Sequence, residues 1–103
     1  MFNSTLPIGT VVMLKGVAKK LMIIGILPIR GEGEDETMYD YIGVLFPEGF
    51  INRETTFLFN QDDINDIIFS GYDNPERREF IFGVEEAYNK DYLASMKSEE
   101  AYE

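Results

Sequence analysis

The fold of this chain is indicated most clearly by the stretch Leu6-Pro7-Ile8-Gly9-Thr10-Val11-Val12-Met13-Leu14-Lys15-Gly16-Val17-Ala18-Lys19-Lys20-Leu21-Met22-Ile23-Ile24-Gly25. Two apolar segments rich in β-branched residues flank a short connection that carries Lys and Gly. This pattern is typical of two strands joined in a hairpin. We therefore expect the chain to open a small sheet domain with a buried β-hairpin.

The rest of the sequence predicts further strands and one helix. Residues 61–64 favour a single helical or 3₁₀ turn, because Asn and Asp side chains cap neighbouring backbone amides. A helix starts at Pro75, which suits the first helical position and follows the capping residues Asp73-Asn74. Its apolar residues recur at spacings of three and four, so we expect the helix over 75–96 and a frayed tail over 97–103. The predicted strands are 10–14, 20–27, 38–46, 55–60 and 66–72.

The connection after the third predicted strand indicates a chain reversal. In Phe46-Pro47-Glu48-Gly49 the Pro is second and the Gly fourth, as a type I turn favours. The predicted fold class is α+β: a small, strongly bent antiparallel sheet of about five strands, with an SH3-like barrel as one form of it. We expect the terminal helix to pack on one open side of this sheet. No repeat or linker divides the chain, so residues 1–103 are predicted to form a single domain.

Charge is distributed unevenly over the 103 residues, whose net charge is −10. Residues 1–31 carry four bases and no acid, whereas residues 32–74 carry eleven acids and one base. Proteins bind phosphate backbones and anionic membranes by neutralising them with Lys and Arg. Because acids outnumber bases in this chain, nucleic acid and membrane surfaces are not expected partners. Cys is absent, which points to a reducing cytoplasm rather than to a disulfide-forming compartment. No apolar run approaches the roughly 20 residues of a membrane helix.

Catalytic and metal-binding patterns are lacking. Without His and Cys, the chain offers no Ser-His-Asp or Cys-His arrangement and no His- or Cys-ligated metal. Carboxylates are abundant, but Glu34-Asp35-Glu36 reads as a solvated loop, because a Ca²⁺ loop needs alternating acids, a central Gly and a closing Glu. Asp62, Asp63 and Asp66 read as local caps rather than as a cation site. We therefore expect no catalytic residue, no cofactor and no metal.

Aromatic residues on and between the predicted third to fifth strands have two interpretations. They could line a peptide groove like that of small SH3-like barrels. They could also fill the core, which is the commoner role of alternating aromatic residues on strands. The residues concerned are Tyr39, Tyr41, Phe46, Phe50, Phe57, Phe59 and Phe69.

Several of these segments together resemble a known family. The chain resembles the four-one-seven-six domain-of-unknown-function family in the order of four segments. These are the opening hairpin, Tyr39-Asp40-Tyr41, Phe46-Pro47-Glu48-Gly49 and Phe69-Ser70-Gly71-Tyr72. The resemblance covers nearly the whole chain. The matching positions are strands, glycines and turns, so they imply a fold and no catalysis.

The resemblance implies a role in protein export. Members of the family are similar to small Firmicutes proteins encoded beside type VII (ESX) secretion genes and their LXG toxins. This implies an accessory role such as a cytoplasmic chaperone or targeting factor. The chain has no Trp-x-Gly signature and no Tyr-x-x-x-Asp/Glu near its carboxyl end, since Tyr92 stands four residues after Tyr88. These departures indicate that it assists export and is not itself the cargo.

Three hypotheses about function remain open. The first is a non-enzymatic protein that binds a secreted toxin or a secretion component, with the acidic loop steering a basic partner. The second is an immunity protein that neutralises a toxin, for which the net charge of −10 would suit a basic nuclease cleft. The third, less favoured, is a carboxylate-based hydrolase. For the first, the candidate protein-binding residues are Tyr39, Tyr41, Phe46, Glu48 and Phe50.

Overall fold

The computed structural model describes residues 5–31 and 33–96, without the side chains of Asp35 and of residues 88–96. These residues fall into two compact units, divided between Tyr72 and Asp73. The first unit contains all the strands, and the second contains the helix α1, Pro75–Met96. The chain is thus α+β, as the sequence predicts.

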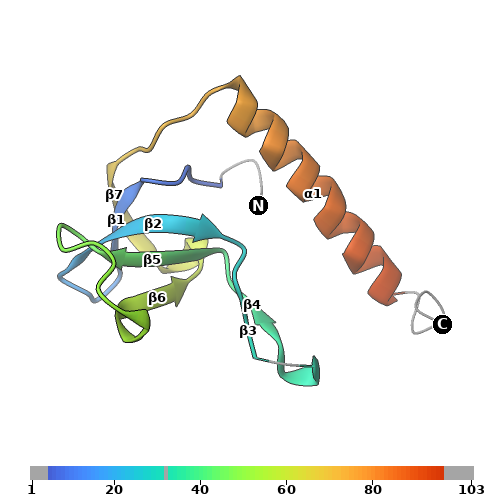
Figure 1. Cartoon of the computed structure of the whole chain (residues 1–103), viewed down its shortest axis with the longest axis horizontal. Coiled ribbons are helices and arrows are strands. Elements are labelled where there is room, and N and C mark those ends of the chain that lie inside the picture. Colours follow the sequence, from blue (N-terminus) through green and yellow to red (C-terminus); the bar gives the residue numbers. More distant parts are fainter. Residues whose placement is uncertain (1–4, 32, 97–103) are drawn as a thin grey trace. The chain divides into compact units, whose positions relative to one another are not determined.

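The first unit is built on a five-stranded antiparallel sheet (Figure 1). Its strand order is β6-β5-β2-β1-β7, so the first strand lies between the second strand and the last. A separate two-stranded sheet pairs β3 with β4. The strands are β1 Val11–Leu14, β2 Lys20–Ile26, β3 Ile29–Arg30, β4 Thr37–Met38, β5 Tyr41–Leu45, β6 Thr56–Phe59 and β7 Ile64–Phe69. The 3₁₀ turns are η2 Gly33–Asp35, η3 Arg53–Thr55 and η4 Gln61–Asp63.

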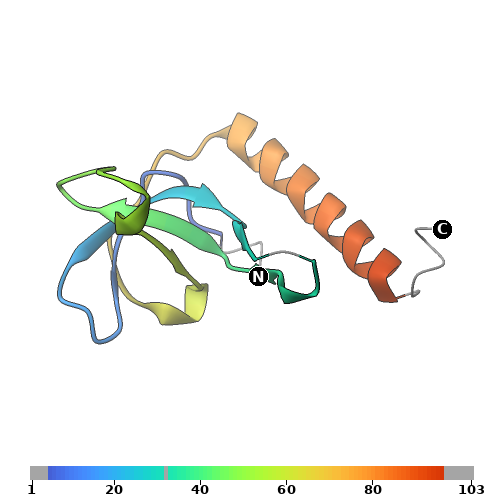
Figure 2. The same cartoon turned by 60° about the horizontal axis from the view of Figure 1, so that its bottom comes forward.

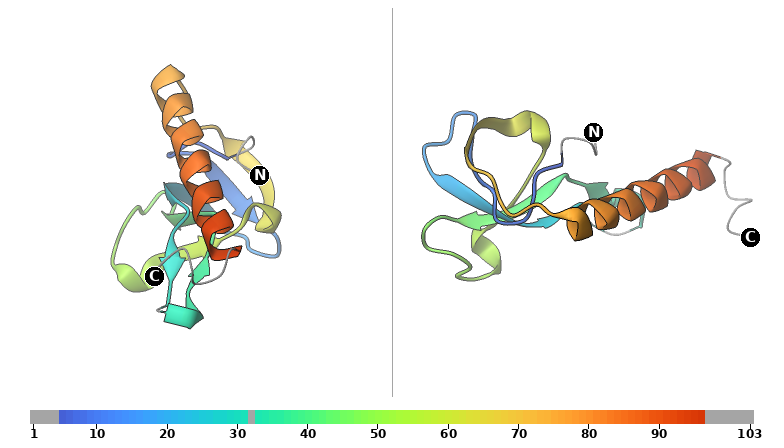
Figure 3. Two further views of the ribbon diagram at one scale, coloured as in Figure 1. Left: turned by 90° about the vertical axis from the view of Figure 1, so that its right-hand side faces the viewer. Right: turned by 90° about the horizontal axis from the view of Figure 1, so that it is seen from above.

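The sheet is bent but does not close into a barrel (Figures 2 and 3). The strands β6 and β7 follow each other in sequence through η4, yet they occupy opposite edges and pair with β5 and β1 respectively. Register shifts between β1 and β7 and between β2 and β5 mark places where a strand has an irregularity. Such bulges bend and twist a strand locally. The bent antiparallel sheet is confirmed, whereas the SH3-like barrel is not formed by the described strands.

The predicted third strand, residues 38–46, is two strands in the structure. Met38 ends β4 in the small sheet, and β5 begins at Tyr41 in the large one. The break lies opposite Leu27, which has a positive φ of 53° and separates β2 from β3. The Leu27 N–H donates to the Asp40 carbonyl (2.9 Å) and the Tyr39 N–H to the Pro28 carbonyl (3.0 Å). The pairing of the two chain segments therefore continues across the break, but β3 and β4 form the separate small sheet and are not part of the large one.

Local signals were more accurate elsewhere. The 3₁₀ turn predicted at residues 61–64 is η4, where the Asp63 carboxylate accepts a hydrogen bond from the Asn60 N–H (2.8 Å). The last strand runs over 64–69 and not 66–72. The chain reverses after Phe46, but the Gly49 N–H donates to the carbonyl of Leu45 (2.7 Å), so the turn begins one residue earlier than predicted.

The helix is confirmed over 75–96. Its first turn is capped by Asn74, whose side-chain oxygen accepts a hydrogen bond from the Arg77 N–H (2.9 Å). Asp73 pairs with Arg77 and Arg78, each at 3.1 Å. The hydrogen bonds that the two guanidinium groups donate to the Asp73 carboxylate, chiefly those from Arg78, hold the pKa of this carboxyl below its usual value. The frayed tail predicted for 97–103 lies outside the described residues.

The hydrophobic core lies on one face of the large sheet. Tyr41 and Phe59 are directly opposite each other on β5 and β6, with ring centroids 5.6 Å apart. Burying such side chains contributes about 1.5–3 kcal/mol each relative to leaving them in water. The core cluster is Val12, Leu21, Ile23, Tyr41 and Phe59.

Candidate protein-binding face

The side of the sheet opposite the core is also apolar, and we call it the outer face. Strand pairing aligns Val11, Met22, Val44 and Thr56 in one row across four strands. A second row joins Ile42 to Leu58, with Ile24 beside it at the irregularity of β2. An antiparallel sheet with one solvated face ordinarily carries polar residues on that face. Val11 and Val44 of the first row are themselves buried, at 5% and 1% exposure, so this sheet carries apolar rows on both faces and the outer face is exposed only in part.

Large apolar side chains are exposed on and around the outer face. Phe50 is 63% exposed and Phe69 62%, which are high values for aromatic residues. Extended exposed apolar areas on soluble proteins mark surfaces that bind proteins, membranes or ligands. The other exposed members include Ile24, Ile29, Phe46 and Ile68.

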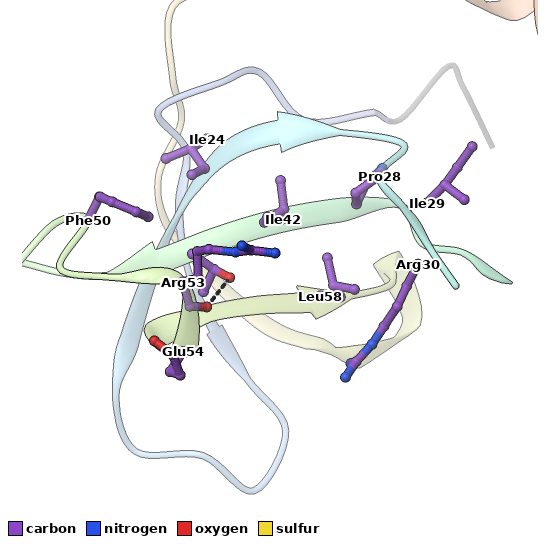
Figure 4. Close-up of a pocket in the computed structure, with 10 residues that line it drawn as sticks. Ile24, Pro28, Ile29, Arg30, Ile42, Phe50, Arg53, Glu54 and Leu58 are labelled. Carbon is purple, nitrogen blue, oxygen red and sulfur yellow. Dashed lines mark hydrogen bonds between the residues drawn. The ribbon is translucent and has the colours of Figure 1, made fainter. Parts of the chain in front are cut away.

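One open groove of about 840 Å³, which we call the outer groove, crosses this face (Figure 4). The side chains of Ile24, Ile42 and Leu58 rise on the same side of β2, β5 and β6 and form its floor. Phe50 borders it from the segment that follows β5. Its remaining lining residues are Pro28, Ile29, Arg30, Arg53, Glu54 and Thr56.

A smaller groove of about 400 Å³ lies at the β7 side and is called here the edge groove. Its lining includes the neighbouring residues Ile68 and Phe69, although successive side chains on a regular strand point to opposite faces. The register shift between β1 and β7 falls at this point, because Val11 pairs with Phe69 and Val12 with Ile67. Ile68 is the extra residue. The other lining residues are Gly9, Val11, Lys20, Met22 and Phe46.

Two of the predicted binding residues line these grooves, Phe46 the edge groove and Phe50 the outer groove. Glu48 is exposed and forms an ion pair of 2.8 Å with Lys19. That hydrogen bond holds the pKa of the Glu48 carboxyl below its usual value. Tyr39 is partly buried beside the bend and lines neither groove.

Tyr41 does not belong to a surface in this structure. It is 1% exposed, and its hydroxyl accepts a hydrogen bond from the Leu6 N–H (2.9 Å) and donates one to the side chain of Gln61. The sequence reading placed it among the partner contacts, but its pairing with Phe59 directs it into the core. Tyr41 therefore supports the fold and is removed from the candidate face.

Arg30 and Arg53 also line the outer groove, and neither was predicted from the sequence. Arg53 lies in η3 and Arg30 in β3, far apart in sequence, and both line the outer groove. One signal was available, because Arg53 is the only base in residues 32–74. Nothing in the sequence alone indicates that Arg30 lies close to it.

In the described part of the chain, no group of three or more Asp and Glu residues could hold a metal ion. All buried side-chain nitrogen and oxygen atoms in that part have a hydrogen-bond partner. None of its helices has the length and apolar character needed to cross a membrane.

Fold and face together define a small α+β protein with a grooved, apolar sheet surface. Residues 5–80 match the family model described as Domain of unknown function (DUF4176), and the chain belongs to this family. The match spans every strand and the start of α1, and it confirms the family resemblance read from the sequence. No curated protein and no solved structure matches the chain.

Proposed function

We propose that this protein is a non-enzymatic accessory factor that binds another protein through the outer face of its sheet. The observation that supports the proposal is the exposed apolar area of that face, above all Phe50 at the border of the outer groove. Exposed aromatic residues beside a groove are the usual anchors of a protein interface, since burying them on binding removes apolar area from water.

The charge of the chain favours a basic partner. A net charge of −10 on 103 residues raises the encounter rate with a positively charged protein surface and disfavours nucleic acid. The acids are concentrated in residues 32–74, the same part of the chain that supplies Phe46 and Phe50. The acids would thus attract a basic partner at long range, and Phe46 and Phe50 would contact the same partner once it is bound.

The family resemblance supports a more specific partner. We propose that it is a secreted LXG toxin or a component of the type VII (ESX) export machinery, and that the protein acts in the cytoplasm as a chaperone or targeting factor. An accessory factor of this kind needs a surface that holds its cargo and releases it. An open groove suits this task better than an enclosed cavity.

An immunity protein is the second candidate, and the net charge of −10 is the observation that favours it. Many toxins are nucleases with a basic cleft, and an acidic protein can cover such a cleft. The two candidates differ in the region of the toxin that they bind. A chaperone or targeting factor would bind the amino-terminal targeting region, and an immunity protein the catalytic domain.

The experiment that tests the proposal is affinity capture of the tagged protein from the native cytoplasm, with mass spectrometry of the bound chains. Phe50→Glu is the test variant, and Val17→Glu is the matched control because Val17 is 43% exposed in the β1–β2 connection, outside both grooves. We expect stoichiometric recovery of a toxin or secretion component that is lost with Phe50→Glu and retained with Val17→Glu. Equal recovery with all three proteins, or none with the folded wild type, would refute the role of this face.

A second step separates the two candidates. The recovered toxin is divided into its amino-terminal region and its catalytic domain, and each is tested separately against the tagged protein. Binding to the amino-terminal region supports the accessory role. Binding to the catalytic domain, with affinity that falls steeply as salt is raised, supports immunity.

A further inference from the structure

The outer groove ends at a free strand edge. Its floor crosses β2, β5 and β6 through Ile24, Ile42 and Leu58, and β6 is the last strand on that side of the sheet. Within the described residues of 5–72, no strand pairs with the edge of β6 that faces away from β5. An edge strand presents unpaired N–H and C=O groups that can pair with an extended segment of another protein.

The two edges of the sheet differ in regularity. β7 pairs with β1 through two register shifts, and such bulges hinder the addition of a further strand. β6 pairs with β5 in an unbroken register from Tyr41–Phe59 to Val44–Thr56. A regular strand beside a groove is the better template, so β6 is the edge at which strand addition is favoured.

The groove also differs in charge from the rest of this acidic chain. Its two bases, Arg30 and Arg53, outnumber its one acid, Glu54. Among the described residues, neither guanidinium has an ion pair or a side-chain hydrogen bond. In Figure 4 the Arg53 guanidinium lies to the left of Leu58, and the Arg30 side chain runs down past β6 so that its guanidinium lies below Leu58. Arginine offers a planar fork of donors that matches a carboxylate.

The free edge of β6 and the two arginines determine which side chains of an added strand would be recognised. Residues i and i+2 of an extended chain point to the same face and lie about 7 Å apart. A strand added beside β6 would place one such side chain next to Leu58, continuing the apolar row of Ile24 and Ile42. The side chains two positions before and after it would point toward the regions of Arg53 and Arg30.

We propose that the outer groove binds an extended segment of the partner by strand addition to β6, and that this segment carries one apolar side chain with a carboxylate two residues away on each side. The inference rests on the proposed protein-binding function and specifies its binding mode. It predicts recognition of an acidic segment by a protein whose net charge is −10, so the selectivity arises from the groove and not from the overall charge.

The probe that tests the inference is a fluorescein-labelled peptide, Gly-Thr-Glu-Thr-Val-Thr-Glu-Thr-Gly, measured by fluorescence anisotropy against the full chain. The comparison peptide has Lys in place of both Glu residues. We expect the Glu peptide to bind more tightly than the Lys peptide, opposite to the order that net charge would produce. Absence of saturable binding of the Glu peptide, or tighter binding of the Lys peptide to the wild type, would overturn the inference.

A pair of charge-reversal variants localises the binding. Arg53→Glu and Lys15→Glu change the net charge equally, but Lys15 is exposed outside both grooves. Arg53→Glu should weaken the Glu peptide at least about tenfold and strengthen the Lys peptide, whereas Lys15→Glu should leave the preference for the Glu peptide unchanged. Equal weakening by both variants would mean that only overall charge matters, which contradicts the inference.

Amide hydrogen exchange tests the strand pairing itself. We expect the bound Glu peptide to slow exchange in β6, residues 56–59, and to leave the edge strand β7 unchanged. Binding that depends on Arg53 without added protection in β6 would overturn strand addition. The outcome is independent of the capture experiment, because a partner lost with Phe50→Glu would uphold the protein-binding function even if this peptide did not bind.

Discussion

Gly71 lies where the end of the sheet crosses the segment before β1, and its replacement by Ala should destabilise the fold strongly. An added Cβ would stand 2.3 Å from the carbonyl oxygen of Ile8, 3.0 Å from the nitrogen of Thr10 and 3.1 Å from the carbonyl carbon of Gly9. All three are backbone atoms, so no side-chain rotation can relieve the contact. The two segments would have to separate by about 1 Å to reach ordinary van der Waals distances.

The size of the effect follows from this displacement. Overpacking of a tight site costs about 1–3 kcal/mol. The Gly71 N–H also donates to the Oγ1 atom of Thr10 (2.9 Å), a fully buried side chain. Lengthening that bond by about 1 Å breaks it, at a further cost of about 1 kcal/mol. We therefore expect Gly71→Ala to lower the free energy of unfolding by about 2–4 kcal/mol.

Urea unfolding followed by circular dichroism measures this difference. With an m value of about 2 kcal/mol/M, the midpoint should fall by about 1–2 M, and the melting temperature by roughly 10 °C or more. Ser70→Ala is the matched control, because Ser70 is exposed and should change stability by no more than about 0.5 kcal/mol. A Gly71→Ala protein as stable as Ser70→Ala would show that the segments do not approach each other as closely as described.

Three further substitutions test other parts of the structure. Tyr41→Phe removes the hydroxyl that bonds two separate segments, so it should cost about 1–2 kcal/mol in urea unfolding while leaving the far-ultraviolet spectrum unchanged; an unaltered midpoint would contradict this role. Asn74→Ala removes the oxygen that accepts from the Arg77 N–H and should destabilise α1 by about 1 kcal/mol, measured as lost helical ellipticity at elevated temperature; unchanged ellipticity would exclude the cap. The Lys19 partner lowers the pKa of Glu48, so the stabilisation is present above the ordinary pKa of Glu and is lost as pH falls through the lowered pKa. Lys19→Met should raise the pKa of Glu48, followed by carboxyl-carbon NMR, toward its ordinary value, and an unmoved titration would mean that the pair does not form in solution.

The sequence predicted the elements whose signals are local. The opening hairpin depends on two β-branched runs, and the start of α1 depends on Asn74-Pro75, so both lie where expected. The register shifts and the positive φ of Leu27 depend on contacts between distant segments. No pattern in a short window contains that information.

The error over residues 38–46 has a specific physical cause. The Asp40 N–H donates to the side chain of Asn60 (2.9 Å), and the Asp40 carboxylate accepts from the Gln61 N–H (2.8 Å). This reciprocal pair holds Asp40 outside the strands and divides an otherwise continuous apolar run. Its partner is about twenty residues away, so the run alone reads as one strand.

The candidate face was only partly accessible to sequence reasoning for the same reason. Tyr39 and Tyr41 are equivalent in a local pattern, and only the pairing of β5 with β6 determines that Tyr41 enters the core. Phe46 and Phe50 were identified through the turn between them. Arg30 could not be assigned to the groove, because its proximity to Arg53 depends on the tertiary fold.

The strand order also determines when this sheet can be completed during synthesis. β1, β2, β5 and β6 are joined to strands that emerge shortly before or after them, whereas β7 is the last strand to be made and pairs with the first. Until residue 69 has left the ribosome, one side of β1 has no partner strand. The Thr10 hydroxyl likewise cannot accept its hydrogen bond from the Gly71 N–H until residue 71 has been made. The amino-terminal hairpin, which is complete at Ile26, therefore keeps an open edge while residues 27–69 are synthesised, and during this stage the edge is exposed to aggregation or to a chaperone.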